Sequence, residues 1–181
     1  TKNLGGAGDG GMVVTSDEIL HSRIRSLKLH GEAAERSFGA LGINGRMDEI
    51  QAALILLRLE EFESEAKKRV TLGSLYREML EGLVGLQTPI EGAEPLWHLF
   101  SVRLQERERI RDALALRGIQ TGVYYPLPFH KVPHLMPYFP DERLETAEAL
   151  ASSVLQIPLH PGMEEADAVF AASALLATLH S

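Results

Sequence analysis

The 181-residue sequence contains no cysteine, a single tryptophan, and fewer basic than acidic side chains. The lack of cysteine excludes disulfide bonds, a catalytic thiolate and a thiolate-bound zinc ion. The formal net charge of −7 argues against nucleic-acid binding, because a protein that binds the phosphate backbone needs a basic surface. No apolar run reaches the roughly 18 residues that suggest a membrane span. A globular protein remains, and its 45% hydrophobic content can build a buried core.

In the N-terminal part of the chain, the pattern predicts a strand, a helix and an irregular segment. Residues 10–15 (GGMVVT) form an apolar run that predicts a short buried strand. Ser16 or Asp17 then caps a helix, whose apolar residues recur at helical spacing as far as Gly31. Residues 31–47 are rich in glycine and predict an irregular connection.

The clearest predicted element is a long helix that begins at Asp48. Gln51 stands three residues further on, which is the spacing of a capping box. An apolar stripe at helical spacing continues to Leu83, and no proline interrupts it. Such a helix would be about 50 Å long, more than a small domain spans, and it therefore indicates a connection between two lobes.

From Trp97 onward, strands and helices alternate around one proline-rich loop. The order predicts a small α/β lobe in which helices pack on a sheet. The expected strands cover residues 97–104, 119–125 and 154–160, the expected helices cover 106–118, 144–153 and 164–179, and the loop covers 126–140.

Five glycines lie between positions 5 and 11, shortly after Lys2. They include a formal G-x-G-x-x-G pattern, which in dinucleotide-binding folds follows a strand and opens a helix. Here the expected strand comes after the glycines, so a tight backbone passage is favoured over a phosphate loop. A lone lysine is usually a solvated surface charge, and only its neighbours give Lys2 a special interpretation.

Six segments occur in a specific order: TKNLGGAGDGGMVVT, LHG, GINGRMDEIQAA, WHLFSVRL, GIQTGVYYPLPFH and LQIPLHPGM. The ordered set resembles the DegT/StrS family of pyridoxal-phosphate-dependent sugar aminotransferases, over essentially the whole chain. The resemblance implies an α/β fold of the aspartate-aminotransferase type. It also implies that the chain holds the tail of the large domain (residues 1–47), a connecting helix (48–84) and the small C-terminal domain (85–181).

The resemblance places the central chemistry on Lys2. In the family, the equivalent lysine forms a Schiff base with pyridoxal phosphate and later moves a proton, and both tasks require a neutral amine. Asn44 is implied to bind the cofactor phosphate of a partner subunit, so a homodimer with shared active sites is expected. Judged from the residues alone, Asn44 and Gly45 form a plain turn signal.

Four further side chains are expected to contact the substrate: His30, Arg46, Tyr125 and His130. A loop histidine bonded to the backbone is an equally good interpretation of His130. His130 and His134 have the i, i+4 spacing of a zinc pair, but Pro133 between them argues against the necessary helix. No metal site is expected.

The resemblance implies a cytoplasmic enzyme that moves an amino group from an amino acid, by family habit glutamate, to a nucleotide-linked keto sugar. Such a step belongs to polysaccharide or amino-sugar biosynthesis. In the family, much of the cofactor site comes from residues before the lysine, so this chain alone is expected to be inactive. The alternative is a non-catalytic regulatory or interaction protein on the same scaffold.

Overall fold

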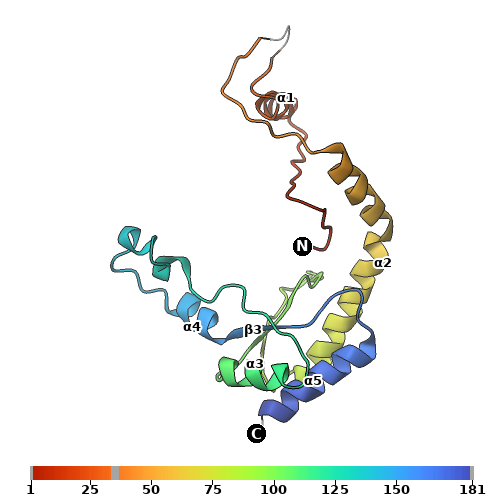
Figure 1. Cartoon of the computed structure of the whole chain (residues 1–181), viewed down its shortest axis with the longest axis vertical. Coiled ribbons are helices and arrows are strands. Elements are labelled where there is room, and N and C mark those ends of the chain that lie inside the picture. The colour runs from red at the N-terminus through yellow and green to blue at the C-terminus, as the bar shows by residue number, and fades with distance from the viewer. Residues whose placement is uncertain (1, 34–36, 180–181) are drawn as a thin grey trace. The chain divides into compact units, whose positions relative to one another are not determined.

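The computed structural model describes residues 2–33 and 37–179 (Figure 1). The chain divides into two compact units, Thr1–Glu63 and Ser64–Ser181, and one helix runs through the boundary. The elements in chain order are α1 (Glu18–Leu27), α2 (Glu49–Leu80), β1 (Gly85–Leu86), β2 (Phe100–Arg103), α3 (Arg107–Ala115), the 3-10 turns η2 (Phe129–Lys131) and η3 (Met136–Tyr138), α4 (Glu145–Ser153), β3 (Val154–Ile157) and α5 (Glu165–Leu179).

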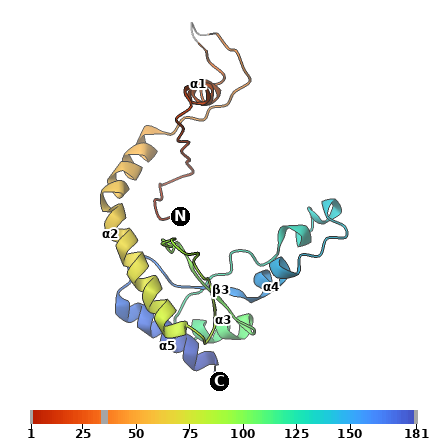
Figure 2. The ribbon, with the colours of Figure 1, turned by 180° about the vertical axis from the view of Figure 1, so that it is seen from behind.

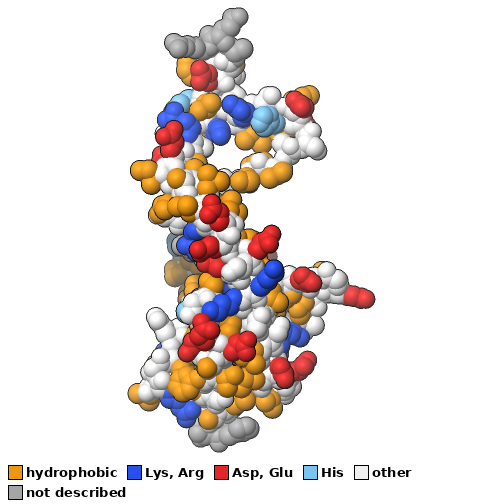
Figure 3. Space-filling model, turned by 90° about the vertical axis from the view of Figure 1, so that its right-hand side faces the viewer, with side chains coloured by type: hydrophobic (Ala, Val, Ile, Leu, Met, Phe, Trp, Pro, Cys, Tyr) orange, Lys and Arg blue, Asp and Glu red, His pale blue; other side chains and the backbone are white. Residues whose placement is uncertain are grey.

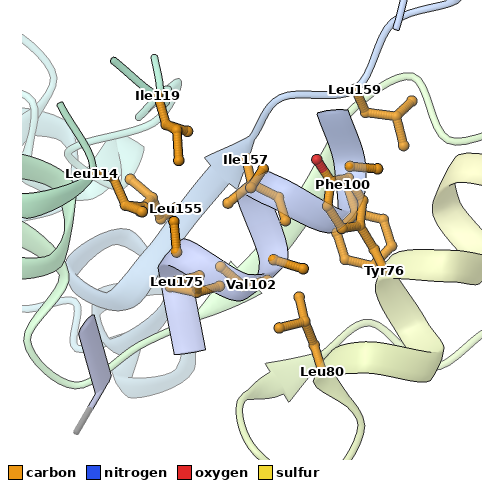
Figure 4. Close-up of a cluster of buried hydrophobic side chains, with 14 of the residues drawn as sticks. Tyr76, Leu80, Phe100, Val102, Leu114, Ile119, Leu155, Ile157, Leu159 and Leu175 are labelled. Carbon is orange, nitrogen blue, oxygen red and sulfur yellow. The ribbon is translucent and has the colours of Figure 1, made fainter. Parts of the chain in front are cut away.

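An antiparallel sheet of three strands organises the second unit, with β2 between β1 and β3. The register places Phe100 opposite Ile157 and Val102 opposite Leu155, and all four side chains are buried. Because side chains alternate along a strand, these four residues share one face of the sheet. The helices α3 and α5 lie next to each other and supply further side chains to the same core (Figures 2 and 4).

The second half of α2 completes this core. Leu72, Tyr76 and Leu80 are fully buried, and the rings of Tyr76 and Phe100 have centroids 5.0 Å apart (Figure 4). The Tyr76 hydroxyl donates to the carbonyl of Pro158 at 2.7 Å, so this buried polar atom has a partner. Burial raises the pKa of Tyr76, and the charge of Asp167 adds to the shift.

A buried arginine ties α2 to the chain that precedes β2. The Nη1 of Arg69 donates to the carbonyls of Trp97 (3.2 Å), His98 (3.3 Å) and Leu159 (3.4 Å). The residue is only 8% exposed, so these carbonyls depend on the guanidinium in place of water. The contact also fixes Trp97, whose φ of 28° lies in the left-handed region.

In the first unit, α1 begins as the sequence predicts. Asp17 is its N-cap, and the carboxylate accepts from the backbone N–H groups of Ile19 at 2.8 Å and Leu20 at 3.0 Å. These bonds satisfy two of the N–H groups that a helix start leaves without an intrahelical partner. No residue of α1 is buried.

Most of the predicted elements are confirmed, but two predicted strands are wrong. Residues 10–15 form no strand, and Met12, Val13 and Val14 are 84%, 65% and 87% exposed. A strand requires a neighbouring strand, and no described segment pairs with this one. Residues 119–125 form only a single bridge, between Gly122 and Gln156, and the prolines that follow cannot extend the pairing because they lack a backbone N–H.

The remaining expectations for the architecture are met in part. The long helix is confirmed and ends three residues before Leu83. The connection 31–47 is irregular where it is described, and its residues 34–36 lie outside the described part. The three-part domain division stays a prediction. Among the residues that the structure describes, no helix is both long and apolar enough to cross a membrane.

The close contact between Gly73 and Trp97 gives the first testable prediction. A Cβ atom at position 73 would lie 2.3 Å from Cδ1 of the buried indole. We expect Gly73→Ala to lower the free energy of unfolding by about 1–3 kcal/mol through overpacking, although alanine gains up to about 1 kcal/mol in helix propensity. Urea unfolding followed by the fluorescence of Trp97 measures the change. The control is Gly11→Ala, because a Cβ there meets no atom within 4 Å; equal midpoints for both variants would contradict the prediction.

Candidate functional site

Lys2 lies in an irregular, glycine-rich segment of the first unit, and its side chain is exposed. A reactive neutral amine needs an enclosed site, and the described residues do not enclose this one. Further along the same segment Gly5 is buried, so the chain is held in place a few residues after the lysine. The residue that holds it comes from the first turn of α2.

That residue is Gln51, whose side-chain amide contacts the glycine segment. Its Oε1 accepts from the backbone N–H of Ala7 at 2.7 Å, and its Nε2 donates to the carbonyl of Asp9 at 3.5 Å. The capping box predicted for Gln51 is therefore wrong, because the amide is turned toward residues 7–9. Asp48 does precede the helix, and its carbonyl accepts the first helical bond from Ala52.

Asn44 lies in a short antiparallel pairing with residues 28–29, just after α1, and not in the turn that the Asn-Gly pair suggested. It forms an isolated bridge with Leu29, and the N–H of Gly45 donates to the carbonyl of Lys28 at 2.9 Å. The backbone on both sides of Asn44 is thus fixed, while its side chain is exposed. An amide presented in this way can donate to an anionic ligand.

His30 is brought next to this pairing in a strained backbone conformation. Its N–H donates to the carbonyl of Ile43 at 3.0 Å, and its φ is 62°. Gly31 follows with a φ of 81°, where an added Cβ would lie 1.8 Å from the carbonyl oxygen of Ala40. Strain of this kind in non-glycine residues concentrates at functional sites. Arg46 is exposed on the same connection.

Tyr125 and His130 come together in the second unit, at a separate cavity of about 640 Å³. Its lining includes the aromatic residues Tyr124, Tyr125, Phe129 and Phe139, of which Tyr125 and Phe129 are 75% and 74% exposed. The strand β3, the helix α4 and further loop residues form the rest of the wall. Most of the lining is apolar, so a flat or apolar group fits the cavity better than a free ion.

His130 is buried in the wall of this cavity and bonded to a carboxylate. Its Nε2 lies 2.9 Å from Oε1 of Glu148, and with an ionised carboxylate this nitrogen must carry the proton. The backbone-bonded interpretation of His130 is therefore not what the structure shows. The hydrogen bond from His130, and then the charge of Lys131, lower the pKa of Glu148.

Two of these contacts carry little or no signal in the sequence. Glu148 lies 18 residues after His130, across two 3-10 turns, and no local pattern pairs them. Gln51 lies 44 residues after Ala7, and only the closely spaced glycines hint that some side chain packs against the backbone there. Within the described residues, no group of three or more His, Asp or Glu side chains could hold a metal ion.

Comparisons with known proteins extend over nearly the whole chain. The model of the DegT/DnrJ/EryC1/StrS aminotransferase family matches residues 1–175. The dTDP-3-amino-3,4,6-trideoxy-alpha-D-glucose transaminase of Streptomyces venezuelae is 40% identical, over 93% of this chain and 45% of that protein. The erythromycin biosynthesis sensory transduction protein EryC1 of Saccharopolyspora erythraea is 37% identical, over 94% and 48%.

A solved structure agrees with these sequence matches. S. venezuelae DesV in complex with a ketimine intermediate superposes with a TM-score of 0.89 at 36% identity, over 97% of this chain and 48% of that one. The chain thus has the α/β fold of the matching part of that enzyme, and it spans about half the length of the curated relatives it matches.

The contact between His130 and Glu148 predicts a pH dependence of stability. A lowered folded-state pKa means that ionised Glu148 stabilises the fold above the ordinary carboxyl pKa, and that this contribution is lost as the pH falls through the lowered value. We expect wild type to be more stable than Glu148→Gln at neutral pH, with a difference that shrinks on acidification. Urea unfolding at a series of pH values measures it. In a His130→Phe background the difference should be smaller at neutral pH; an undiminished difference there would exclude His130 as the cause.

Proposed function

The chain belongs to the DegT/DnrJ/EryC1/StrS aminotransferase family, and on this premise we propose that it is part of an enzyme that aminates a nucleotide-linked keto sugar. Members of this family are pyridoxal-phosphate-dependent aminotransferases. The observation that carries the proposal is that one family match includes both Lys2 and Asn44. The S. venezuelae relative, which is named for a dTDP-linked amino sugar, supports the substrate class.

The proposed domain assignment follows the same family logic. Residues 1–47 are the tail of a large cofactor-binding domain, residues 48–84 are a connecting helix and residues 85–181 are a small C-terminal domain of an aspartate-aminotransferase-type fold. The coverage of about half of each relative supports an assignment to part of a longer enzyme. The exposure of Lys2 is consistent with the expectation that this chain alone is inactive.

The residues of the first unit fit pyridoxal phosphate by their chemistry. The aldehyde of this cofactor requires a primary amine, and Lys2 supplies one beside a backbone that is mostly glycine. The phosphate requires N–H donors, and the exposed amide of Asn44 is one such donor. When bound, the cofactor supplies an electron sink for the charge left when a proton leaves the amino-acid Cα.

The protein's own residues then bind, orient and move protons. The Nζ of Lys2 would hold the cofactor aldehyde and, once the amino donor has taken its place, would accept the proton from the Cα of the donor as a general base. In the second half of the transfer Lys2 would give a proton to the sugar carbon that receives the amino group, so that an amino acid and a keto sugar become a keto acid and an amino sugar. The side-chain amide of Asn44 would donate to the cofactor phosphate of a partner subunit. Arg46 and His30 in the first unit, and separately Tyr125 and His130 in the second unit, are the proposed substrate contacts, and the Arg46 guanidinium is suited to a diphosphate.

The active site is proposed to be shared in a homodimer. The first unit and the start of α2 expose many large apolar side chains, visible at the surface in Figure 3, and contiguous patches of this kind mark interaction sites. They include Met12, Val13, Val14, Ile50, Leu54 and Leu57.

Substitution of one such side chain tests the dimer. Leu57 on α2 is 61% exposed, and a charge buried at an interface without a partner is strongly unfavourable. We expect Leu57→Glu in the full-length protein to weaken self-association at least about tenfold, measured by sedimentation equilibrium. Leu116→Glu, at a position 91% exposed in the second unit, is the matched control and should leave association unchanged. If Leu57→Glu associates as strongly as wild type, the proposal that this face forms the dimer interface is wrong.

Replacement of Lys2 tests the activity itself. We expect Lys2→Ala in the full-length protein to lower the rate of amino transfer at least about hundredfold, since both the attachment point and the general base are removed. Borohydride reduction followed by mass spectrometry should place the cofactor on Lys2 in wild type. The exposed Lys28 supplies the control, because Lys28→Ala should retain both properties. A cofactor trapped on another lysine would overturn the assignment.

The second candidate function is non-catalytic regulation on the same scaffold. It is favoured by one observation, the sensory transduction name of the S. erythraea relative, which also matches almost the whole chain. Unaffected turnover in Lys2→Ala, or an absence of turnover in wild type with glutamate and a keto sugar, would support this candidate over the enzyme.

A further inference from the structure

The contact between α2 and the glycine segment is specific in its chemistry. Gln51 both accepts a hydrogen bond from Ala7 and donates one to Asp9, two residues apart on one stretch of backbone. Among side chains of this length, only an amide presents an acceptor and a donor together at neutral pH. A glutamate here would be able only to accept, and an apolar residue would leave both backbone groups to water.

The glycine segment is shaped to receive this amide. A Cβ atom on Gly6 would lie 2.7 Å from Oε1 and 2.8 Å from Cδ and Nε2 of Gln51, closer than real Cβ contacts. A Cβ atom added to Gly10 would lie 3.2 Å from Cε of Met47, whereas a Cβ atom added to Gly11 would meet no atom within 4 Å. A side chain at Gly6 would therefore displace the Gln51 amide from its present position, whereas the three nearest atoms include none of the backbone.

We propose that Gln51 is a positioning residue for Lys2, acting through the segment that it holds; this inference rests on the proposed function. Only five positions separate Lys2 from Ala7, so a fixed Ala7 limits where the lysine can reach. Glycine is otherwise the most flexible of residues, and a free glycine-rich tether would spread the amine over many positions. Catalysis by a positioned group loses rate steeply when that group is misplaced.

Hydrogen exchange on the cofactor-free, full-length protein tests the clamp without any activity. We expect Gln51→Ala to accelerate exchange of the Ala7 amide by about three- to tenfold, as for the loss of one hydrogen bond. Gln51→Glu keeps the acceptor and should retain most of the protection. Gly6→Ala should accelerate exchange as well, because its methyl group displaces the amide, and should add nothing in a Gln51→Ala background.

Two matched controls define the result. Gly11→Ala makes the same chemical change in open space, and Glu61→Ala removes an exposed side chain from α2; neither should alter exchange at Ala7. Far-UV circular dichroism verifies that each variant keeps its helices. Unchanged exchange in Gln51→Ala, or equal behaviour of Gly6→Ala and Gly11→Ala, would overturn the clamp.

The link to Lys2 is tested in the cofactor-loaded enzyme. We expect Gln51→Ala to lower kcat about ten- to hundredfold while the KM for the keto sugar stays unchanged, with Gln51→Glu in between. Faster exchange with an unchanged kcat would overturn the positioning role. If borohydride reduction places the cofactor on a residue other than Lys2, both the proposed function and the positioning role are wrong. The hydrogen-exchange results would still decide whether Gln51 holds the backbone of Ala7 and Asp9.

Discussion

The helix α2 belongs to both compact units, and its two ends contact different parts of the chain. At its start, Gln51 bonds the backbone of the glycine segment that carries Lys2. Along its second half, Tyr76 and its neighbours fill the core of the small sheet, and Arg69 satisfies three carbonyls of the surrounding loops. One continuous helix therefore contains both the residue that bonds Ala7 and Asp9 and the residues that stabilise the second unit.

The sequence predicts well what depends on local periodicity. The helices and the strands β2 and β3 follow from apolar spacing, and Asp17 follows from the chemistry of a helix start. Prediction fails where a partner distant in sequence decides the outcome. The apolar run 10–15 has strand-forming residues but no neighbouring strand in the described part of the chain. The amide of Gln51 bonds to backbone 44 residues earlier in the sequence, so the capping box that the spacing predicts does not form.

The same distinction applies to the candidate site. Lys2 and Asn44 are identifiable only because an ordered set of motifs surrounds them, since a lysine or an Asn-Gly pair alone is uninformative. The family match over residues 1–175 confirms the motif set, and the roles of the individual residues stay proposals. The carboxylate that bonds His130 comes from the next α-helix, and no spacing rule selects Glu148 among the acidic residues there.

The exposed run Met12–Val14 has a consequence for handling the protein. These three consecutive apolar residues are exposed and pair with no other segment that the structure describes, so their backbone groups are open to pairing between molecules. Pairing between molecules through this segment would increase with protein concentration and would compete with native assembly. Precipitation of the isolated chain would then indicate that this apolar segment is uncovered, and not that the sheet of the second unit is badly packed.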